Sequence, residues 1–249
     1  MNHSPDSVGT LYGIGVGPGD PELLTLKGLR LLRAVPVVYV PVARPGARSY
    51  AESIVADYLD RARQQVAPLV FVMRADQATR SHQWVRNAEI IARHLETGAD
   101  AAFVTEGDPL FYSTFDHVAS CLMELSPQAR IVVVPGVSSL NAAAAGIRVP
   151  LADGDQRLAV VPATAGQTAL RAALEDFECV AILKVSSALD LVLDTLEEAG
   201  RTRDAICVVR CGTSDEVVYA DVRCLRGRQL DYFSLMLVRR PHADGRQHA

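Results

Sequence analysis

The stretch Tyr12-Gly-Ile-Gly-Val-Gly-Pro-Gly-Asp-Pro21 places four glycines at alternate positions directly after an apolar run. Glycine lets the backbone turn tightly and lets a ligand approach it closely. Asp20 and Pro21 supply a helix start, because Asp caps helix N-termini and Pro suits the first helical position. The stretch therefore predicts a strand, a glycine turn and a helix in succession. It leaves open whether the turn binds a ligand or is a plain structural connection.

A dinucleotide-binding turn is the obvious rival, but the spacing is wrong. The pattern Gly-x-Gly-x-x-Gly needs its third glycine three positions after the second. Counted from Gly13, that position is Pro18, and counted from Gly15 it is Asp20. The phosphate-binding pattern Gly-x-x-x-x-Gly-Lys-Ser/Thr is also absent from the sequence. A nicotinamide-dependent oxidoreductase is therefore not favoured.

Short apolar runs alternate with helical patterns through the first half of the chain. Strands that are apolar throughout are buried on both faces, which is typical of parallel strands covered by helices. Helical spacing is shown by Leu23, Leu26, Leu29 and Leu32 and again by Trp84, Ala88, Ile91 and Leu95. The expected strands are Leu11–Val16, Val35–Val40, Leu69–Val72, Ala101–Val104 and Ile131–Val134.

The second half predicts a mixed α/β domain. Two late segments, Glu216–Val222 and Tyr232–Val238, flank the turn region Arg226-Gly-Arg228 and predict an antiparallel hairpin. The Pro-, Gly- and Asp-containing residues 148–155 break the periodicity and predict a linker. We therefore expect an α/β fold of two α/β domains, residues 1–147 with a mostly parallel sheet and residues 156–249 with a mixed sheet. The other strands expected in this half are Leu158–Val161, Val180–Leu183 and Ile206–Val209.

The composition argues against several classes of protein. A formal net charge of −4 without a basic stripe disfavours nucleic-acid binding. The sequence contains no apolar run of about 18 residues, so we expect no membrane span. The polar residues 1–7 give no sign of a signal peptide. The odd count of five cysteines favours reduced thiols and a cytoplasmic protein. We expect no metal site, because the cysteines and histidines lack the spacing of a ligand set.

Two further loops follow expected strands. Thr105-Glu-Gly-Asp-Pro-Leu-Phe-Tyr-Ser-Thr-Phe115 repeats the Gly-Asp-Pro of residues 19–21, and Pro135-Gly-Val-Ser-Ser-Leu-Asn141 follows the next strand. Open α/β sheets bind ligands at the carboxyl ends of their strands, and helix N-termini suit polar ligand groups. Capped helices without a ligand would explain the Asp residues equally well. No nucleophilic triad or Gly-x-Ser-x-Gly elbow is present.

Taken together, these motifs resemble the tetrapyrrole (corrin/porphyrin) methylase family, the class III S-adenosylmethionine (SAM) methyltransferases. The resemblance runs from about Gly9 to Arg240. Leu23-Leu-Thr-Leu-Lys27, the loop of residues 105–115 and Asp231-Tyr-Phe-Ser-Leu235 look like the branch that methylates C20 of precorrin-2. The motifs that carry the family resemblance are residues 13–20, 107–109, 135–139, Leu183-Lys-Val185 and Cys211-Gly-Thr213.

The resemblance implies two α/β domains with SAM in the cleft between them, and a homodimer. It implies that SAM is held by Pro18, Glu106, Gly107, Asp108, Phe111, Ser138, Ser139, Lys184 and Gly212. Uroporphyrinogen methyltransferases carry an Asp just after the second strand that has been proposed to handle protons. This chain has Val40-Pro41 there, so we assign no catalytic acid or base.

The family chemistry implies a tetrapyrrole substrate rich in carboxylates, which Arg side chains bind well. Arg44 and Arg48 follow the second expected strand and are candidates to hold it, or they are solvated loop charges. Tyr112 is a further substrate-side candidate. The expected reaction is SAM-dependent methyl transfer to C20 of precorrin-2, giving precorrin-3A in cobalamin biosynthesis. The alternatives are a cobalt-containing substrate, a diphthine synthase-like methylase, and a non-catalytic SAM-binding protein.

Overall fold

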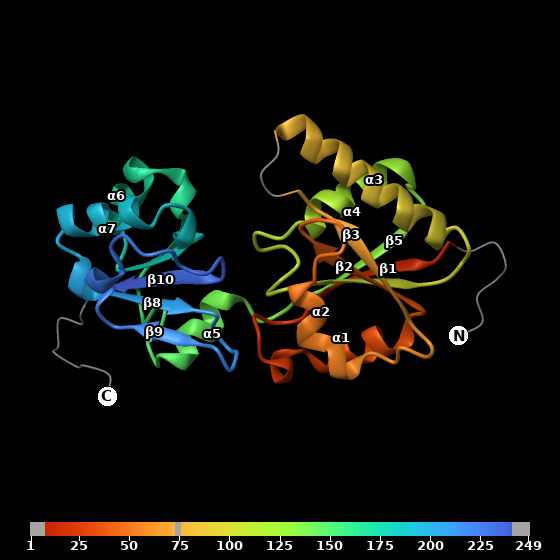
Figure 1. Ribbon diagram of the computed structural model, residues 1–249, viewed down its shortest axis with the longest axis horizontal. Helices are drawn as coiled ribbons and strands as arrows, with labels where there is room; N and C mark the ends of the chain where they lie inside the picture. The colour runs from red at the N-terminus through yellow and green to blue at the C-terminus, as the bar shows by residue number, and fades with distance from the viewer. Residues whose placement is uncertain (1–7, 73–75, 241–249) are drawn as a thin grey trace. The chain divides into compact units, whose positions relative to one another are not determined.

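The computed structural model describes residues 8–72 and 76–240. The chain divides into two compact units, Met1–Ser138 and Ser139–Ala249, and each is described by itself (Figure 1). The division falls before helix α5 (Ser139–Gly146). Residues 148–155, which the sequence predicts as a linker, thus follow α5 within the second unit.

The first unit contains a five-stranded parallel sheet in the order β3-β2-β4-β1-β5. The expectation of parallel strands covered by helices is confirmed. Strand β4 is buried along its whole length, as its central place requires. Strand β3 lies at an edge, where Pro68 costs no ladder hydrogen bond. The strands are β1 (Thr10–Gly15), β2 (Val37–Val42), β3 (Gln65–Val70), β4 (Ala101–Thr105) and β5 (Arg130–Val134).

Helices cover both faces of this sheet. One core contains Phe103 of β4 with Ile91 of α3 and Phe115 of α4. The other contains Ile14 of β1 with residues of α1 and α2, such as Leu32 and Ile54. The strands β1, β2 and β4 therefore bury side chains on both faces, as their apolar sequences require. The helices are α1 (Leu26–Ala34), α2 (Tyr50–Val55), α3 (Gln77–Leu95) and α4 (Phe115–Leu125).

The second unit contains a mixed sheet in the order β6-β7-β10-β8-β9. The predicted hairpin is wrong in its pairing: β10 lies antiparallel between β7 and β8, and β9 pairs antiparallel with β8. The reason is burial, because β10 is apolar and buried along nearly its whole length, whereas β9 is largely exposed. A central position therefore suits β10, and an edge position suits β9. The strands are β6 (Leu158–Pro162), β7 (Cys179–Leu183), β8 (Ala205–Val209), β9 (Val217–Tyr219) and β10 (Ser234–Arg239).

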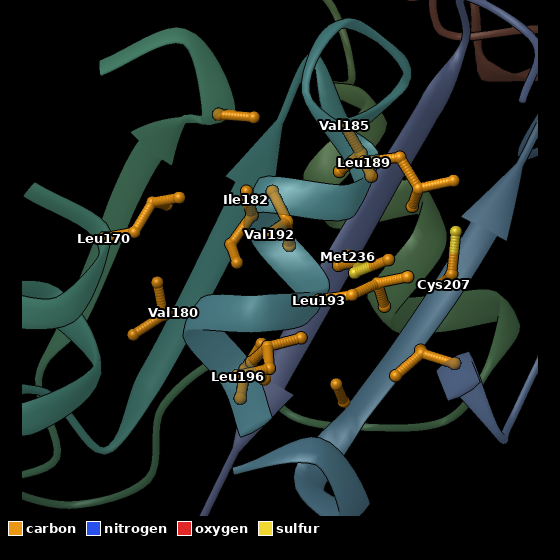
Figure 2. Packing of buried hydrophobic residues seen from close by; sticks show 14 of the residues in the cluster. Leu170, Val180, Ile182, Val185, Leu189, Val192, Leu193, Leu196, Cys207 and Met236 are labelled. Atoms are coloured by element: carbon orange, nitrogen blue, oxygen red, sulfur yellow. The ribbon is translucent and has the colours of Figure 1, made fainter. Parts of the chain in front are cut away.

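Helices α6 (Gln167–Asp176) and α7 (Leu189–Glu198) pack on this sheet. Figure 2 shows Val192, Leu193 and Leu196 of α7 beside Ile182 of β7 and Met236 of β10. All five side chains are almost completely buried. They belong to a larger cluster of buried apolar residues, whose removal from water stabilises this unit.

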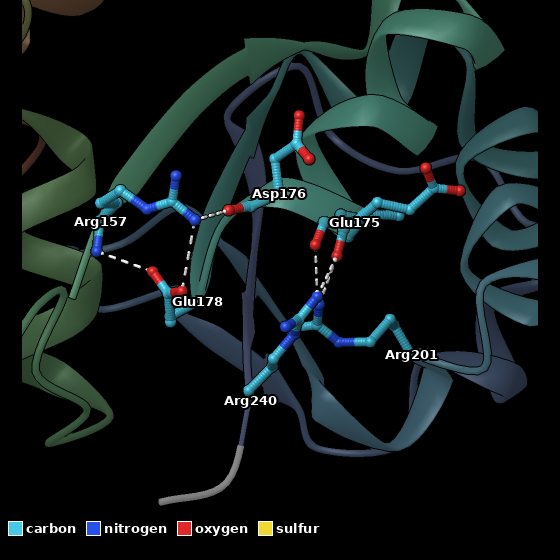
Figure 3. Close-up of polar contacts among 7 residues, drawn as sticks. Arg157, Glu175, Asp176, Glu178, Arg201 and Arg240 are labelled. Carbon is cyan, nitrogen blue, oxygen red and sulfur yellow. Dashed lines mark hydrogen bonds and ion pairs between the residues drawn. The ribbon is translucent and has the colours of Figure 1, made fainter.

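Three arginines bind the C-terminal carbonyls of α6 (Figure 3). Arg201 donates to the carbonyl of Leu174 at 2.7 Å, and Arg240 donates to the carbonyls of Leu174 and Glu175 at 3.1 and 2.6 Å. Arg157 donates to the carbonyl of Asp176. The last carbonyls of a helix lack partners within it and carry partial negative charge, so the three guanidinium groups stabilise this end.

Within the ranges that the structure describes, no helix combines the length and the apolar character needed to cross a membrane. The same ranges contain no cluster of His, Cys, Asp or Glu arranged to hold a metal ion.

Candidate functional site

The turns after β1 and β4 are joined at the carboxyl edge of the first sheet. The amide of Val16 donates to the carbonyl of Thr105 at 3.0 Å, and the amide of Gly107 donates to the carbonyl of Gly17 at 2.8 Å. Gly17 and Gly107 form an antiparallel bridge, with φ of +80° and +67°. Such φ values suit glycine, which has no Cβ to clash. The two glycine turns that the sequence singles out therefore lie side by side.

The loop after β5 packs directly against these turns. A Cβ on Gly136 would lie 2.1 Å from the carbonyl oxygen of Gly107 and 2.7 Å from Cα of Gly15. At Gly107 a Cβ would meet nothing closer than Cα of Ser138 at 4.0 Å. Gly15 and Gly136 thus serve the approach of one backbone to another, whereas Gly107 has no close neighbour at the position of a Cβ.

Asp108 links two of these loops. Its Oδ1 accepts the amide of Leu110 at 2.9 Å, and its Oδ2 accepts the amide of Gly136 at 3.0 Å. The expectation that Asp108 and Pro109 start a helix is wrong, because the next helix, α4, begins only at Phe115. The carboxylate is used to join the ends of β4 and β5 instead of capping a helix.

At the first turn, Asp20 does cap a helix as expected. Its Oδ1 accepts the amide of Glu22 at 2.8 Å at the start of the short 3-10 helix η1 (Pro21–Leu23). Pro18 is buried, and its carbonyl accepts the hydroxyl of Tyr50 at 2.8 Å. Since Tyr50 is the first residue of α2, this bond fixes the turn after β1 to the helix that follows β2. Tyr50 has no motif around it, so the sequence does not predict this contact.

Glu106 lies between β4 and the bridged Gly107. Its side chain is part-buried, and burial raises the pKa of its carboxyl group above the ordinary value of 4.5. Among the described residues, the group that favours its charged form is its own backbone amide. A carboxylate that is removed from water without a cationic partner is costly. The position therefore suits a ligand that brings a positive charge.

The predicted aromatic and serine residues lie near the same turns. The rings of Phe111 and Tyr112 meet edge to face, with centroids 5.1 Å apart. Tyr112 is 51% exposed and has φ of +56°, an uncommon conformation for a bulky residue. Ser138 is the neighbour of Gly107 described above. The structure thus brings together Pro18, Glu106, Gly107, Asp108, Phe111 and Ser138 from three loops at one edge of the sheet.

Arg44 and Arg48 are set apart from this group. Both are exposed in the loop after β2, where the amide of Ala47 donates to the carbonyl of Arg44 at 3.1 Å. Neither guanidinium forms an ion pair or hydrogen bond in the described part of the chain. They follow a strand of the same sheet edge, but no hydrogen bond or ion pair among the described residues joins their side chains to the glycine turns.

In the second unit, the predicted residues Ser139 and Gly212 lie in segments that contact each other. The thiol of Cys211 donates to the carbonyl of Ser139 at 3.6 Å, and the amide of the next residue, Gly212, donates to Oε2 of Glu216 at 2.7 Å. Lys184 follows β7 and has φ of +57°. Glu216 fixes the turn that contains Gly212, a role that no sequence motif indicates.

Comparisons with known proteins agree on one family. The model of the family described as Tetrapyrrole (Corrin/Porphyrin) Methylases matches residues 10–223. The cobalt-precorrin-2 C(20)-methyltransferase of Salmonella typhimurium is 32% identical over 92% of this chain and 96% of its own length. The precorrin-2 C(20)-methyltransferase of a Sinorhizobium species is 31% identical over 93% of this chain and 95% of its own length. The cobalamin biosynthesis protein CobIJ of Mycobacterium tuberculosis is 35% identical, and this chain spans 46% of its length.

Solved structures share the fold. The X-ray structure of a cobalamin biosynthetic enzyme, cobalt precorrin-4 methyltransferase, superimposes with a TM-score of 0.72 at 22% identity, covering 92% of this chain and 94% of that one. The uroporphyrin-III C-methyl transferase of Thermus thermophilus, complexed with S-adenosylhomocysteine, gives a TM-score of 0.65 at 24% identity, covering 93% and 97% of the two chains.

Proposed function

This chain belongs to the tetrapyrrole (corrin/porphyrin) methylases, and from that premise we propose that it transfers a methyl group from SAM to C20 of precorrin-2, giving precorrin-3A. The observation that carries the proposal is the set of relatives that match almost the whole chain at about 30% identity and are named for methylation at C20. The activity of the whole protein is itself part of the proposal, because the chain covers only about half of the CobIJ proteins.

The chemistry of the turns supports SAM as the donor. SAM carries a sulfonium, an ammonium and a carboxylate, so its binding site needs an acidic partner and backbone polar groups. Glu106 offers a part-buried carboxylate that has no cationic partner among the described residues, and a Cβ on Gly107 would meet no close neighbour. A protein of the same fold is complexed with the demethylated donor. We propose that the donor is held by Pro18, Glu106, Gly107, Asp108, Phe111, Ser138, Ser139, Lys184 and Gly212.

Bound SAM supplies an electrophilic methyl group on a sulfur that leaves as a neutral thioether. The residues of the chain therefore need to orient the two reactants and to exclude water, and no covalent intermediate is needed. The bond from Asp108 to the amide of Gly136 and the bridge between Gly17 and Gly107 hold the turns in fixed register. The proposal keeps Arg44, Arg48 and Tyr112 as candidates for the substrate side.

A cobalt-containing substrate is the second candidate. It is favoured by two relatives named for cobalt-precorrin-2, from Methanocaldococcus jannaschii at 30% and Salmonella typhimurium at 32% identity, against 31% for the precorrin-2 enzyme.

The test is methyl transfer by the purified protein from isotope-labelled SAM. Precorrin-2 and cobalt-precorrin-2 are supplied in parallel, and the products are identified by mass spectrometry and by the position of the labelled carbon. We expect one labelled methyl group at C20 with one of the two substrates. Label at another carbon would overturn the assignment to C20. Donor binding without transfer to either tetrapyrrole would favour a non-catalytic SAM-binding protein.

We also propose that the protein is a homodimer and that it acts in the cytoplasm. All five cysteines are free thiols, which suits a reducing compartment. Native mass spectrometry of the purified protein tests the dimer and, in the same spectrum, shows whether the donor or its demethylated product is retained.

A further inference from the structure

Two basic residues at one edge of the second sheet have a strained backbone. Strands β7 and β8 both end beside the start of β10, where Ser234 pairs with Val209. The next residues, Lys184 and Arg210, have φ of +57° and +53°. Left-handed conformations cost free energy for any residue with a Cβ and cluster at functional sites. Glycine would adopt either conformation at lower cost, so a long basic side chain here needs a reason.

The guanidinium of Arg210 is only partly used within the protein. Its Nη1 donates to Oδ2 of Asp231 at 3.1 Å, and the two side chains are 36% and 32% exposed. Its Nε is buried and has no hydrogen-bond partner. Nη2 is not buried, and no hydrogen bond to it occurs in the described ranges. A half-exposed contact through one nitrogen stabilises little, whereas an unpaired buried N–H is costly.

The two unused donors form one side of the guanidinium. Nε and Nη2 point in the same direction, but protein atoms cover Nε, so Nη2 is the donor that an acceptor from outside can reach. Asp231 is kept on the other side, because its Oδ1 accepts the amide of Phe233 at 2.9 Å and its carbonyl accepts the hydroxyl of Ser234. The ion pair with Asp231 therefore orients the guanidinium and leaves Nη2 for another acceptor.

We propose that Arg210 binds a carboxylate of one of the two reactants through Nη2. The inference rests on the proposed function, whose reactants both carry carboxylates: the tetrapyrrole has many, and the methionine part of SAM has one. Arg210 is two residues from Gly212, and the amide of Arg210 donates to the carbonyl of Phe233 at 2.8 Å. The same segment thus holds this guanidinium beside a residue that the proposed function assigns to the donor.

The experiment compares Arg210→Asn with Arg223→Asn in the full chain. Asn tolerates a left-handed backbone but cannot reach a ligand as Arg does. Arg223 is a matched control, because Asp221 already occupies its Nε and Nη2, both at 2.8 Å, on an exposed surface. Calorimetry with S-adenosylhomocysteine gives the affinity for the donor side, and initial rates give KM for the methyl acceptor identified with the wild type.

We expect Arg210→Asn to weaken one of these two quantities by about tenfold to hundredfold, with no loss in melting temperature. The reactant whose binding weakens carries the carboxylate. Arg210→Lys should restore only part of the loss, and Arg223→Asn should change neither quantity. Folded Arg210→Asn protein with both quantities unchanged would overturn the inference, as would an equal loss in the control. If Arg210→Asn folds poorly, Arg210→Gly repeats the measurement. A wild type that binds no donor and methylates no tetrapyrrole would instead refute the proposed function.

Discussion

Glu106 brings a carboxylate into a part-buried turn in which no other described side chain compensates its charge. Burial raises its pKa above 4.5 in the folded protein. Between the unfolded and the folded pKa, the folded state binds more protons, so the stability contribution of Glu106 is full at low pH and is lost as the pH rises through the folded pKa. We expect Glu106→Gln to raise the melting temperature at neutral pH and to melt like the wild type below pH 4.5. Thermal melts across this range test it, and equal melting at neutral pH would contradict it.

Glu106→Gln should weaken donor binding, although it stabilises the protein without the donor. In the proposed site, the ionised carboxylate pairs with the positive charge of the donor, so affinity should rise with pH through the folded pKa of Glu106. We expect Glu106→Gln to weaken donor binding by about tenfold or more and to flatten its pH dependence. Calorimetry at several pH values measures both effects. Glu89→Gln, on an exposed part of α3, is the control and should change neither. A pH-independent affinity in the wild type would refute the role of this carboxylate.

For single residues, hydrogen bonds to near neighbours in the chain could be predicted from the sequence, and hydrogen bonds to distant residues could not. The cap by Asp20 follows from its neighbour Pro21 and needs only residues close by in the chain. Asp108 stands in the same tripeptide but accepts the amide of Gly136, and this partner could not be known before the sheet order was. The roles of Tyr50, Arg210 and Glu216 depend on such distant or turn-specific contacts and were missed for the same reason.

At the scale of elements, the ends of β4, β1 and β5 are held together through backbone contacts. In Gly136→Ala, the added Cβ would lie 2.1 Å from the carbonyl oxygen of Gly107, and backbone atoms cannot move aside easily. We expect a loss of about 3 kcal/mol of unfolding free energy, together with loss of donor binding. Urea denaturation measures the first and calorimetry the second.

The control is Gly146→Ala in helix α5. Its added Cβ would meet Oε1 of Glu216 at 3.5 Å, an ordinary contact. Replacing a helical glycine with alanine should be neutral or stabilise the protein by up to about 1 kcal/mol. Gly136→Ala that is as stable as this control would show that the loops can separate without cost.

The strands show what hydrophobic patterns can and cannot predict. Continuous apolar runs predicted the parallel strands of the first unit because both faces of such strands are buried. The same kind of run in β10 was assigned to a hairpin, since an apolar segment alone does not identify its partners. The start of β3 was missed because Gln65–Val70 is exposed or half-buried at most positions and contains Pro68. Edge strands carry weaker patterns than central ones, so their bounds are harder to predict.

At the scale of the whole molecule, the proposed donor site draws residues from both compact units. The division lies between Ser138 and Ser139, two consecutive residues that the proposal assigns to the same ligand. A ligand that binds the folded state stabilises it by about 2.7 kcal/mol at a hundred times its dissociation constant. If it contacts both units, it should slow local opening in each of them.

Hydrogen exchange with and without S-adenosylhomocysteine tests this expectation. We expect slower amide exchange in residues 106–111 of the first unit and in residues 210–216 of the second, because the proposed contacts restrain both loops. Helix α3 is the internal control, since the proposal assigns no donor contact to its residues 77–95. Protection of residues 106–111 alone would contradict the assignment of Lys184 and Gly212 and leave the glycine turns as the donor site. Protection of neither loop, at a concentration that raises the melting temperature, would place the donor elsewhere on the protein.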